Sequence, residues 1–216
     1  MASCTQDFGA LVDGANSGSG CSPGETKGSC TKSGGCSTCN DDHCTLDCNT
    51  CGETCAPIEC TKPSCSAQCG NGATCEVHCP DRGTECSVGA IGGVAHVLGA
   101  AANHTINCDQ HATCSLAPIT GQTGETVLTC TSGSSCSART SGTNFKANCS
   151  GGSTCIVECD VLGDSPSCAV ECNDTSVCRL KCPGGKSCDL KCGGRTPVRC
   201  NGNDGWSACD EQQCPP

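Results

Sequence analysis

Cysteine recurs in this chain at a fixed spacing, and that spacing limits the available folds more than any other feature. Of 216 residues 31 are cysteines, above the roughly 8–10% at which a chain is read as a disulfide scaffold. Four segments have the form C-x5-C-x3-C, with a period of ten: Cys69–Cys79, Cys149–Cys159, Cys172–Cys182 and Cys182–Cys192. The five-residue arm also occurs alone at Cys108/Cys114 and Cys130/Cys136. The chain is therefore treated as a repeat protein.

The three-residue arm alternates between two kinds of side chain. Cys155, Val157 and Cys159 would share one face, while Glu158 would point the other way. A period of two predicts a β-strand with one buried face. Within the five-residue arm, glycine recurs three positions before the second cysteine, which suits a corner that needs a positive φ. These glycines are Gly72, Gly133, Gly152 and Gly185.

Short strands joined by glycine corners at a fixed period predict a solenoid whose coils stack on one another. An aliphatic interior is excluded, because Leu, Ile, Val and Phe number only 26 of 216, below the ~20% usual for globular chains. Disulfides at ~3 kcal/mol each can take its place. We expect an all-β fold, a disulfide-stapled β-solenoid or narrow β-helix with coils of about ten residues and few aromatics. Stacked ~4.8 Å apart, fifteen or more coils would make a rod of roughly 70–85 Å.

The cysteines that follow this spacing are the candidate half-cystines, and the sequence leaves their pairing open. They are Cys69, Cys75, Cys79, Cys108, Cys114, Cys130, Cys136, Cys149, Cys155, Cys159, Cys168, Cys172, Cys178, Cys182, Cys188 and Cys192. So many disulfides require an oxidising compartment, so we expect a secreted or cell-surface protein. The rival interpretation is a reduced, metal-binding chain like metallothionein, although CC and CxC pairs are absent from this sequence.

Charged residues between the cysteines are expected on the outer surface of the coils. If consecutive strands stack directly, Glu171 lies beside Lys181 and Arg179 lies beside Asp189 on adjacent coils. A basic cluster near the C-terminus is a candidate interaction face, with an ordinary solvated surface as the alternative. It contains Arg179, Lys181, Lys186, Lys191, Arg195 and Arg199.

Net charge and hydropathy restrict the partners. The formal charge of −10 argues against nucleic-acid binding, which needs a basic face. No stretch reaches the ~18–20 apolar residues of a transmembrane helix. Ala2-Ser3-Cys4 resembles the end of a bacterial lipobox, so Cys4 is a candidate for lipidation and the membrane is expected to be reached only through that anchor. The alternative is an ordinary half-cystine or free thiol. A signal peptide is not recognised, so an exported chain would be a mature form.

The spacing divides the chain into five segments. Residues 1–29 are expected to be irregular and rich in Gly and Ser, and residues 30–86 to form one cysteine-dense half of the solenoid. Residues 87–107 lack cysteine and contain the best helical candidate, Val94–Ala102, so we expect a wider coil or a short packed helix there. Residues 108–200 would form the second half. Residues 201–216 would form a C-terminal cap in which Trp206 covers the open end.

The five-residue cysteine spacing and the short coils resemble insect antifreeze solenoids over residues 60–200. The resemblance implies disulfides across each coil and a flat ice-binding face, which would carry a double column of threonines. The hydroxyl column here lacks a second column beside it; its members are Ser64, Thr74, Thr113, Ser135, Thr154, Ser167 and Ser187. Repeats such as NCSGGSTCIVEC are also similar in composition to Cys/Gly-rich secreted and lipoprotein repeats of myxobacteria, a resemblance that implies no particular activity.

Enzymatic motifs are missing from the sequence. It contains no G-x-S-x-G, P-loop, H-E-x-x-H or dinucleotide fingerprint, so we expect no catalytic residues, no cofactor and no dedicated metal site. The function expected is that of a rigid structural or interaction element outside the cell. It would associate end to end into fibres or act as an adhesive component of a cell envelope or matrix. Ice binding and thiolate metal binding are the alternatives.

Overall fold

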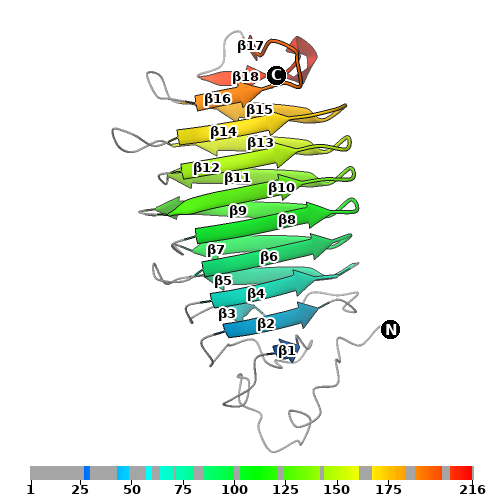
Figure 1. The fold of residues 1–216 in the computed structure, drawn as a ribbon, viewed down its shortest axis with the longest axis vertical. Helices are drawn as coiled ribbons and strands as arrows, with labels where there is room; N and C mark the ends of the chain where they lie inside the picture. Colours follow the sequence, from blue (N-terminus) through cyan, green and yellow to red (C-terminus); the bar gives the residue numbers. More distant parts are fainter. Residues whose placement is uncertain are drawn as a thin grey trace, which may run out of the picture.

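The structure is a computed structural model that describes residues 27–29, 43–48, 57–59, 64–70, 72–79, 85–99, 103–120, 124–141, 144–160, 167–182, 188–200 and 205–215. Within these residues the chain forms stacked coils of β-strand (Figure 1). Disulfides cross the interior between the two layers of strands. The expected fold class, a disulfide-stapled β-solenoid, is confirmed.

Each coil contributes one strand to each of two sheets, with nine described strands per sheet. Sheet A contains β1 (Lys27–Ser29), β2 (His43–Cys48), β4 (Ser64–Cys69), β6 (Glu85–Ile91), β8 (Asn103–Asp109), β10 (Glu125–Cys130), β12 (Asn144–Cys149), β14 (Ser167–Cys172) and β16 (Cys188–Lys191). Sheet B contains β3 (Ile58–Glu59), β5 (Thr74–Cys79), β7 (Val94–Gly99), β9 (Thr113–Thr120), β11 (Ser135–Ser141), β13 (Thr154–Cys159), β15 (Val177–Lys181), β18 (Trp206–Ala208) and β17 (Val198–Arg199). A short 3-10 helix, η2 (Glu211–Gln213), follows β18.

The length of the coil differs from the sequence expectation. Glu85 pairs with Asn103 and Asn144 pairs with Ser167, so one coil spans 18 to 23 residues. The period of ten is one strand and one corner, which is half a coil. Because strands that follow each other lie in opposite sheets, nine strands of sheet A extend over about 38 Å at ~4.8 Å per spacing, not 70–85 Å.

Side-chain alternation builds the interior in three columns. In β13 Cys155, Val157 and Cys159 are buried, whereas Thr154, Ile156 and Glu158 face outward. The strands pair in parallel and in register, which stacks like positions on like positions. The central column is aliphatic, and the two outer columns consist mostly of cysteines at the strand ends. A strand with only one central aliphatic residue can therefore still have a filled interior face.

Two successive residues with positive φ turn the chain from sheet A to sheet B at three of the described short corners, Gln110–His111, Ser132–Gly133 and Gly151–Gly152. Gly72, Gly133 and Gly152 have φ of 77°, 73° and 75°, which confirms three of the four expected corner glycines. Gly185 lies outside the described residues. Ser134 N donates to Thr131 O at 3.1 Å across one such corner. Two positive φ values and this hydrogen bond are the features of a type I′ turn.

The cysteine-free stretch 87–107 continues the solenoid. Of the two alternatives expected there, the short helix at Val94–Ala102 is wrong, because Val94–Gly99 is strand β7, paired in parallel with β5 and β9. The wider coil is wrong as well, because Glu85 pairs with Asn103, 18 residues further on. Alternating burial outweighs helical composition here, because Ala95 and Val97 are both fully buried opposite β6. The expected irregular segment ends in a strand, since Lys27–Ser29 forms β1 beside β2; residues 1–26 lie outside the described residues.

At the C-terminal end, sheet B changes direction. Strand β18 pairs antiparallel with both β15 and β17. Trp206 lies opposite Lys181, whose ammonium is 5.7 Å from the centre of the indole ring. Lys181 belongs to the outward-facing positions of β15, so Trp206 lies on the outer face of sheet B. Disulfides Cys192–Cys209 and Cys200–Cys214 hold this tail to the last coil.

Candidate functional sites along the solenoid

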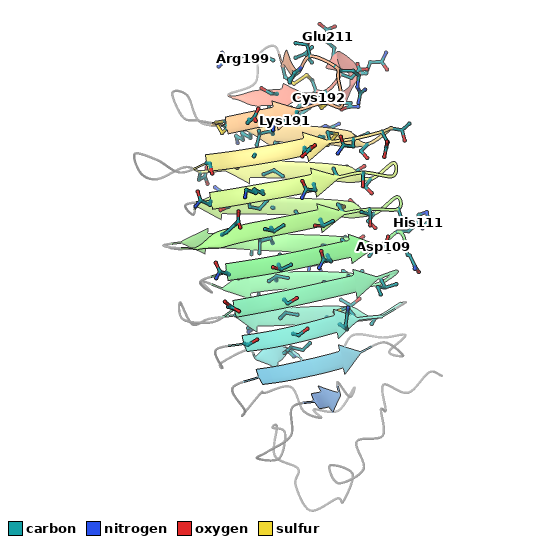
Figure 2. All side chains as sticks on the ribbon, in the orientation of Figure 1. Asp109, His111, Lys191, Cys192, Arg199 and Glu211 are labelled. Atoms are coloured by element: carbon teal, nitrogen blue, oxygen red, sulfur yellow. A yellow bond between two sulfur atoms is a disulfide. The ribbon has the colours of Figure 1, made fainter. Side chains whose placement is uncertain are left out.

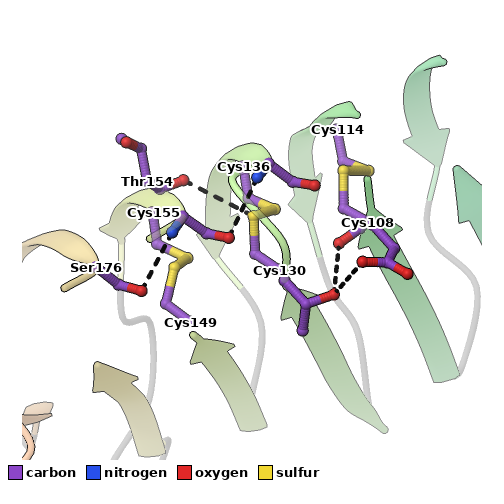
Figure 3. Close-up of a disulfide and its surroundings, with 12 residues drawn as sticks. Cys108, Cys114, Cys130, Cys136, Cys149, Thr154, Cys155 and Ser176 are labelled. Atoms are coloured by element: carbon purple, nitrogen blue, oxygen red, sulfur yellow. Dashed lines mark hydrogen bonds between the residues drawn. A yellow bond between two sulfur atoms is a disulfide. The ribbon is translucent and has the colours of Figure 1, made fainter. Parts of the chain in front are cut away.

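Disulfides bridge the two sheets at five of the described short corners, three of which are drawn in Figure 3. Each joins a residue at or next to the end of a sheet A strand to the second residue of the sheet B strand that follows, with Cα atoms 6.0 to 6.3 Å apart. The C-x5-C arm is therefore one staple around one corner. The pairs are Cys69–Cys75, Cys108–Cys114, Cys130–Cys136, Cys149–Cys155 and Cys172–Cys178.

A second set of disulfides closes the opposite corner, where the chain returns from sheet B to sheet A. These pairs are Cys79–Cys86, Cys159–Cys168 and Cys182–Cys188. With Cys192–Cys209, all sixteen candidate half-cystines lie in disulfides. Sequence spacing missed Cys86 because the return loop varies in length, and it missed Cys200, Cys209 and Cys214 because the tail leaves the repeat. Every cysteine whose side chain is described, 21 in all, is disulfide-bonded.

Some coils carry other side chains where their neighbours carry a disulfide. Ala90 and Ala95 occupy the short-corner positions between Cys69–Cys75 and Cys108–Cys114. At the opposite corner three successive sheet A strands, β8, β10 and β12, replace the cysteine with another buried side chain. These are His104, Thr126 and Phe145, each no more than 2% exposed. The interior therefore accepts small, polar or aromatic groups in place of sulfur.

His104 is the buried titratable group of this column. It is 1% exposed and lies in register between Cys86 and Thr126. Burial lowers its pKa from the ordinary 6.5 to about 4, because a charged imidazole loses its hydration there. His104 is therefore neutral at physiological pH and acts as a packing residue.

The sulfur atoms of neighbouring staples form a continuous column. Sγ atoms of Cys108, Cys130 and Cys136 lie within 4.8 Å of one another, and so do those of Cys130, Cys149 and Cys155. The carbonyl oxygen of Thr154 lies 3.8 Å from Cys130 Sγ (Figure 3). Thiolates at these distances would suit a soft metal ion, but in disulfides they are not available as thiolates.

Polar side chains follow the short corners on the outside. Asp109 accepts a hydrogen bond from Thr131 Oγ1 at 2.8 Å. Hydrogen bonds from Ser132, then Thr131 and the backbone of Gln110, hold the pKa of the Asp109 carboxyl below its ordinary value. His111 is in the same corner as Asp109 (Figure 2), and its backbone has φ of 63°. These contacts connect one coil with the next and leave both side chains at the surface.

The basic cluster does not form one face. Arg179, Lys181 and Arg199 lie on sheet B, whereas Lys191 lies on sheet A (Figure 2). Arg195 follows β16 and its Nε donates to the carbonyl of Cys192 at 3.4 Å. Lys186 lies outside the described residues. Consecutive strands belong to opposite sheets, so cations close in sequence are separated in space.

The expected ion pairs between consecutive strands are wrong for the same reason. Glu171 lies beside Lys191 on sheet A, and Glu158 lies beside Lys181 on sheet B. Lys181 Nζ is 3.7 Å from Glu158 Oε2. Lys191 Nζ is 3.8 Å from Asp189 Oδ2, two positions away on its own strand. Exposed pairs of this kind help to define register and add little stability.

The hydroxyl column is likewise divided. Ser64 and Ser167 lie on sheet A; Thr74, Thr113, Ser135 and Thr154 lie on sheet B; Ser187 lies outside the described residues. The expected absence of a second column was wrong at three positions. Ser66 lies beside Ser64 on β4 of sheet A, and Ser115 and Ser137 pair with each other beside Thr113 and Ser135 on sheet B. The second column of sheet B continues into His96 and Ile156, so the hydroxyl patch there extends over two coils.

A groove of about 400 Å³ crosses strands β4, β6, β8 and β10 of sheet A. Its walls carry short hydroxyl and amide side chains together with two carboxylates, those of Glu85 and Glu125. Lys146 forms an ion pair with Glu125, whose backbone N–H donates to Asn103 Oδ1 at 3.0 Å. Such a surface can hydrogen-bond a polar ligand. The lining residues are Ser64, Cys65, Ser66, Glu85, Cys86, Ser87, Asn103, His104, Thr105, Glu125 and Val127.

No family model matches this chain, and neither a curated protein nor a solved structure matches it. Among the described residues, no helix has the length and apolar character needed to cross a membrane. Cys4, the candidate for lipidation, lies outside the described residues. Function must therefore be argued from the solenoid itself.

Proposed function

We propose that this protein is a rigid rod that acts as a structural or interaction element outside the cytosol, secreted or held at a cell surface. The observation that carries the proposal is the complete oxidation of the 21 cysteines whose side chains are described. Disulfides persist in oxidising compartments, and the cytosol would reduce them. Because the aliphatic content of the chain is small, these cross-links supply much of the stability that a hydrophobic core would otherwise supply, and they keep the rod in shape outside the cytosol.

The C-terminal end of the rod is poorly suited to end-to-end stacking, which favours association through the long faces of the rod. A parallel solenoid grows by adding parallel strands to both sheet edges. Sheet B instead ends in β18, which runs antiparallel to β15, and in the two-residue edge strand β17 beyond it. A very short edge strand is one of the ways in which proteins block strand addition. End-to-end association would therefore favour the edge formed by β1 and β3, and adhesion would use the long outer faces.

Oxidation of the native protein is the first property to test. Native material is isolated in a thiol-blocking buffer, denatured and titrated for free thiols. The proposal predicts one or two free thiols for 31 cysteines and loss of protease resistance after mild reduction, because the disulfides restrict the unfolded chain. Surface labelling of intact cells should reach the protein. Mostly free thiols, with copper or zinc bound, would establish the thiolate metal store instead.

Ice binding is a second candidate, favoured by the patch of Thr113, Ser115, Ser135 and Ser137 on sheet B. The patch covers two coils and is bordered by His96 and Ile156, so the rod proposal predicts no inhibition of ice recrystallisation. Inhibition that is lost in Thr113→Lys and retained in Thr105→Lys, on the opposite sheet, would favour ice binding. Electron microscopy of native material then distinguishes single rods from fibres.

A further inference from the structure

Three metal-ligating side chains lie together on the outer face of sheet B. Glu76 and His78 are two positions apart on β5, and His96 lies opposite Glu76 on the adjacent strand β7. Val77 and Val97, the residues between them, are fully buried, so all three polar side chains point outward. A strand rises ~3.3 Å per residue and its neighbour lies ~4.8 Å away, so the three Cβ atoms form a compact triangle.

Hydrogen bonds already orient two of these side chains. His78 Nε2 lies 2.5 Å from Glu76 Oε1. His96 Nδ1 lies 2.5 Å from Ser115 Oγ on β9, the strand on the other side of β7. The two nitrogens of an imidazole point in nearly opposite directions. With Nδ1 of His96 in contact with Ser115, Nε2 is the nitrogen left to bind a metal ion. Among the described residues only groups of cysteines have their ligand atoms within 4.8 Å of one another, so metal binding requires Glu76 and His78 to exchange their mutual contact for the ion by rotating their side chains.

The chemistry of this set is that of a zinc-type centre. Two imidazoles and one carboxylate are ligands that Zn²⁺ accepts in tetrahedral geometry, with water in the fourth position. Imidazole also suits Ni²⁺ and Cu²⁺ but is a poor ligand for Ca²⁺ and Mg²⁺. Ser115 supplies the outer contact that metal-binding histidines commonly have, because an Nδ1–H that donates to an oxygen leaves Nε2 as the ligand.

We propose that Glu76, His78 and His96 bind a late first-row divalent cation such as Zn²⁺, and that Ser115 positions the His96 ring. The site uses no cysteine, so it is compatible with a fully oxidised protein and is independent of the rod function proposed above. It is separate from the sulfur column, which lies inside the solenoid on other strands.

The test uses the full-length oxidised protein and ZnCl₂ alone. After free thiols have been blocked, isothermal titration at neutral pH should show saturable binding of one Zn²⁺ per chain. His78→Gln and His96→Gln should each weaken binding by about tenfold or more, and Ser115→Ala by a smaller factor that Ser115→Thr restores. His111→Gln is the matched control, since His111 is an exposed corner residue.

Two further measurements separate loss of metal binding from loss of folding. Disulfide content and circular dichroism establish that each variant is folded, and Co²⁺ in place of Zn²⁺ should give the visible absorption of a tetrahedral centre. Absence of saturable Zn²⁺ binding overturns the proposal. So does wild-type affinity in both histidine variants, because the ion would then bind elsewhere. An equal loss in His111→Gln also overturns it, since binding would not depend on this cluster.

Discussion

Cys86 and His104 occupy the same inward position on neighbouring strands of sheet A, yet only Cys86 is cross-linked, to Cys79 on sheet B. Gly99, with φ of 126°, stands where Cys79 stands one coil earlier. A Cβ on Gly99 would lie 2.2 Å from the Cys79 carbonyl oxygen, so the chain can pass this point only as glycine. The imidazole of His104 therefore fills the space that a disulfide fills at other corners. The side chains at one corner can differ from those at the next while the strand pairing of the coil stays the same.

Stability should depend on pH through His104. Its pKa is lowered to about 4 in the folded protein, whereas an unfolded histidine titrates near 6.5. Between pH ~4 and ~6.5 the unfolded state therefore binds more protons than the folded state does. The free energy of unfolding keeps its whole His104 contribution above pH ~6.5 and falls by about 3 kcal/mol as the pH drops toward ~4. His104→Gln should lose this part of the decrease. Denaturant unfolding of both proteins with disulfides intact, at neutral and acidic pH, measures it; parallel pH curves would contradict the prediction.

Removing one staple should weaken the protein without changing its fold. Cys130→Ala with Cys136→Ala copies the natural pair Ala90 and Ala95, which occupies the same corner two coils away. For a loop of this length the expected loss is about 2 kcal/mol of unfolding free energy. Denaturant unfolding gives the loss, and disulfide mapping by mass spectrometry gives the remaining pairs. Exchange of the remaining disulfides to new partners would show that register depends on sulfur and not on strand pairing.

The reverse change should add a staple. Ala90 lies between Cys69 and Cys108, and Ala95 between Cys75 and Cys114, so Ala90→Cys with Ala95→Cys places two thiols at a corner whose neighbours have Cα atoms 6.1 Å apart. We expect the new disulfide to form and to add about 2 kcal/mol. Peptide mapping under non-reducing conditions detects the bond. Persistent free thiols at both positions would show that this corner is wider than its neighbours.

Gly133 should tolerate alanine poorly, for two separable reasons. Its φ is 73°, and an added Cβ would lie 2.9 Å from Cδ2 of His111 in the adjacent corner. Gly194 has a φ of 87° but open space around its Cβ position, so Gly194→Ala carries only the backbone strain, about 1 kcal/mol. Gly133→Ala should therefore cost more than Gly194→Ala in thermal unfolding. Gly133→Ala with His111→Ala should recover the difference, because His111→Ala removes the ring and keeps a Cβ at a residue whose φ is 63°. Equal costs for Gly133→Ala and Gly194→Ala would show that the clash contributes nothing.

The sequence by itself determined the local structure of this protein. Alternation at Cys155, Val157 and Cys159 is enough to define a strand with one buried face, and the glycines at 72, 133 and 152 are enough to define corners, because both patterns reflect the conformation of a few adjacent residues. Cysteine density was likewise enough to predict disulfides across the interior, whereas the buried aliphatic column between them exceeds what the low aliphatic content led us to expect.

Tertiary structure alone decided which strands lie side by side. Period-two alternation gives the buried face of a strand but not its sheet, so the sequence could not show that Glu158 pairs with Lys181, that the basic cluster is divided, or that Val94–Gly99 continues sheet B. The partner of Cys79 was also beyond sequence spacing, because the return loops vary in length. The juxtaposition of Glu76, His78 and His96 depends in the same way on a parallel register that joins residues about one coil apart.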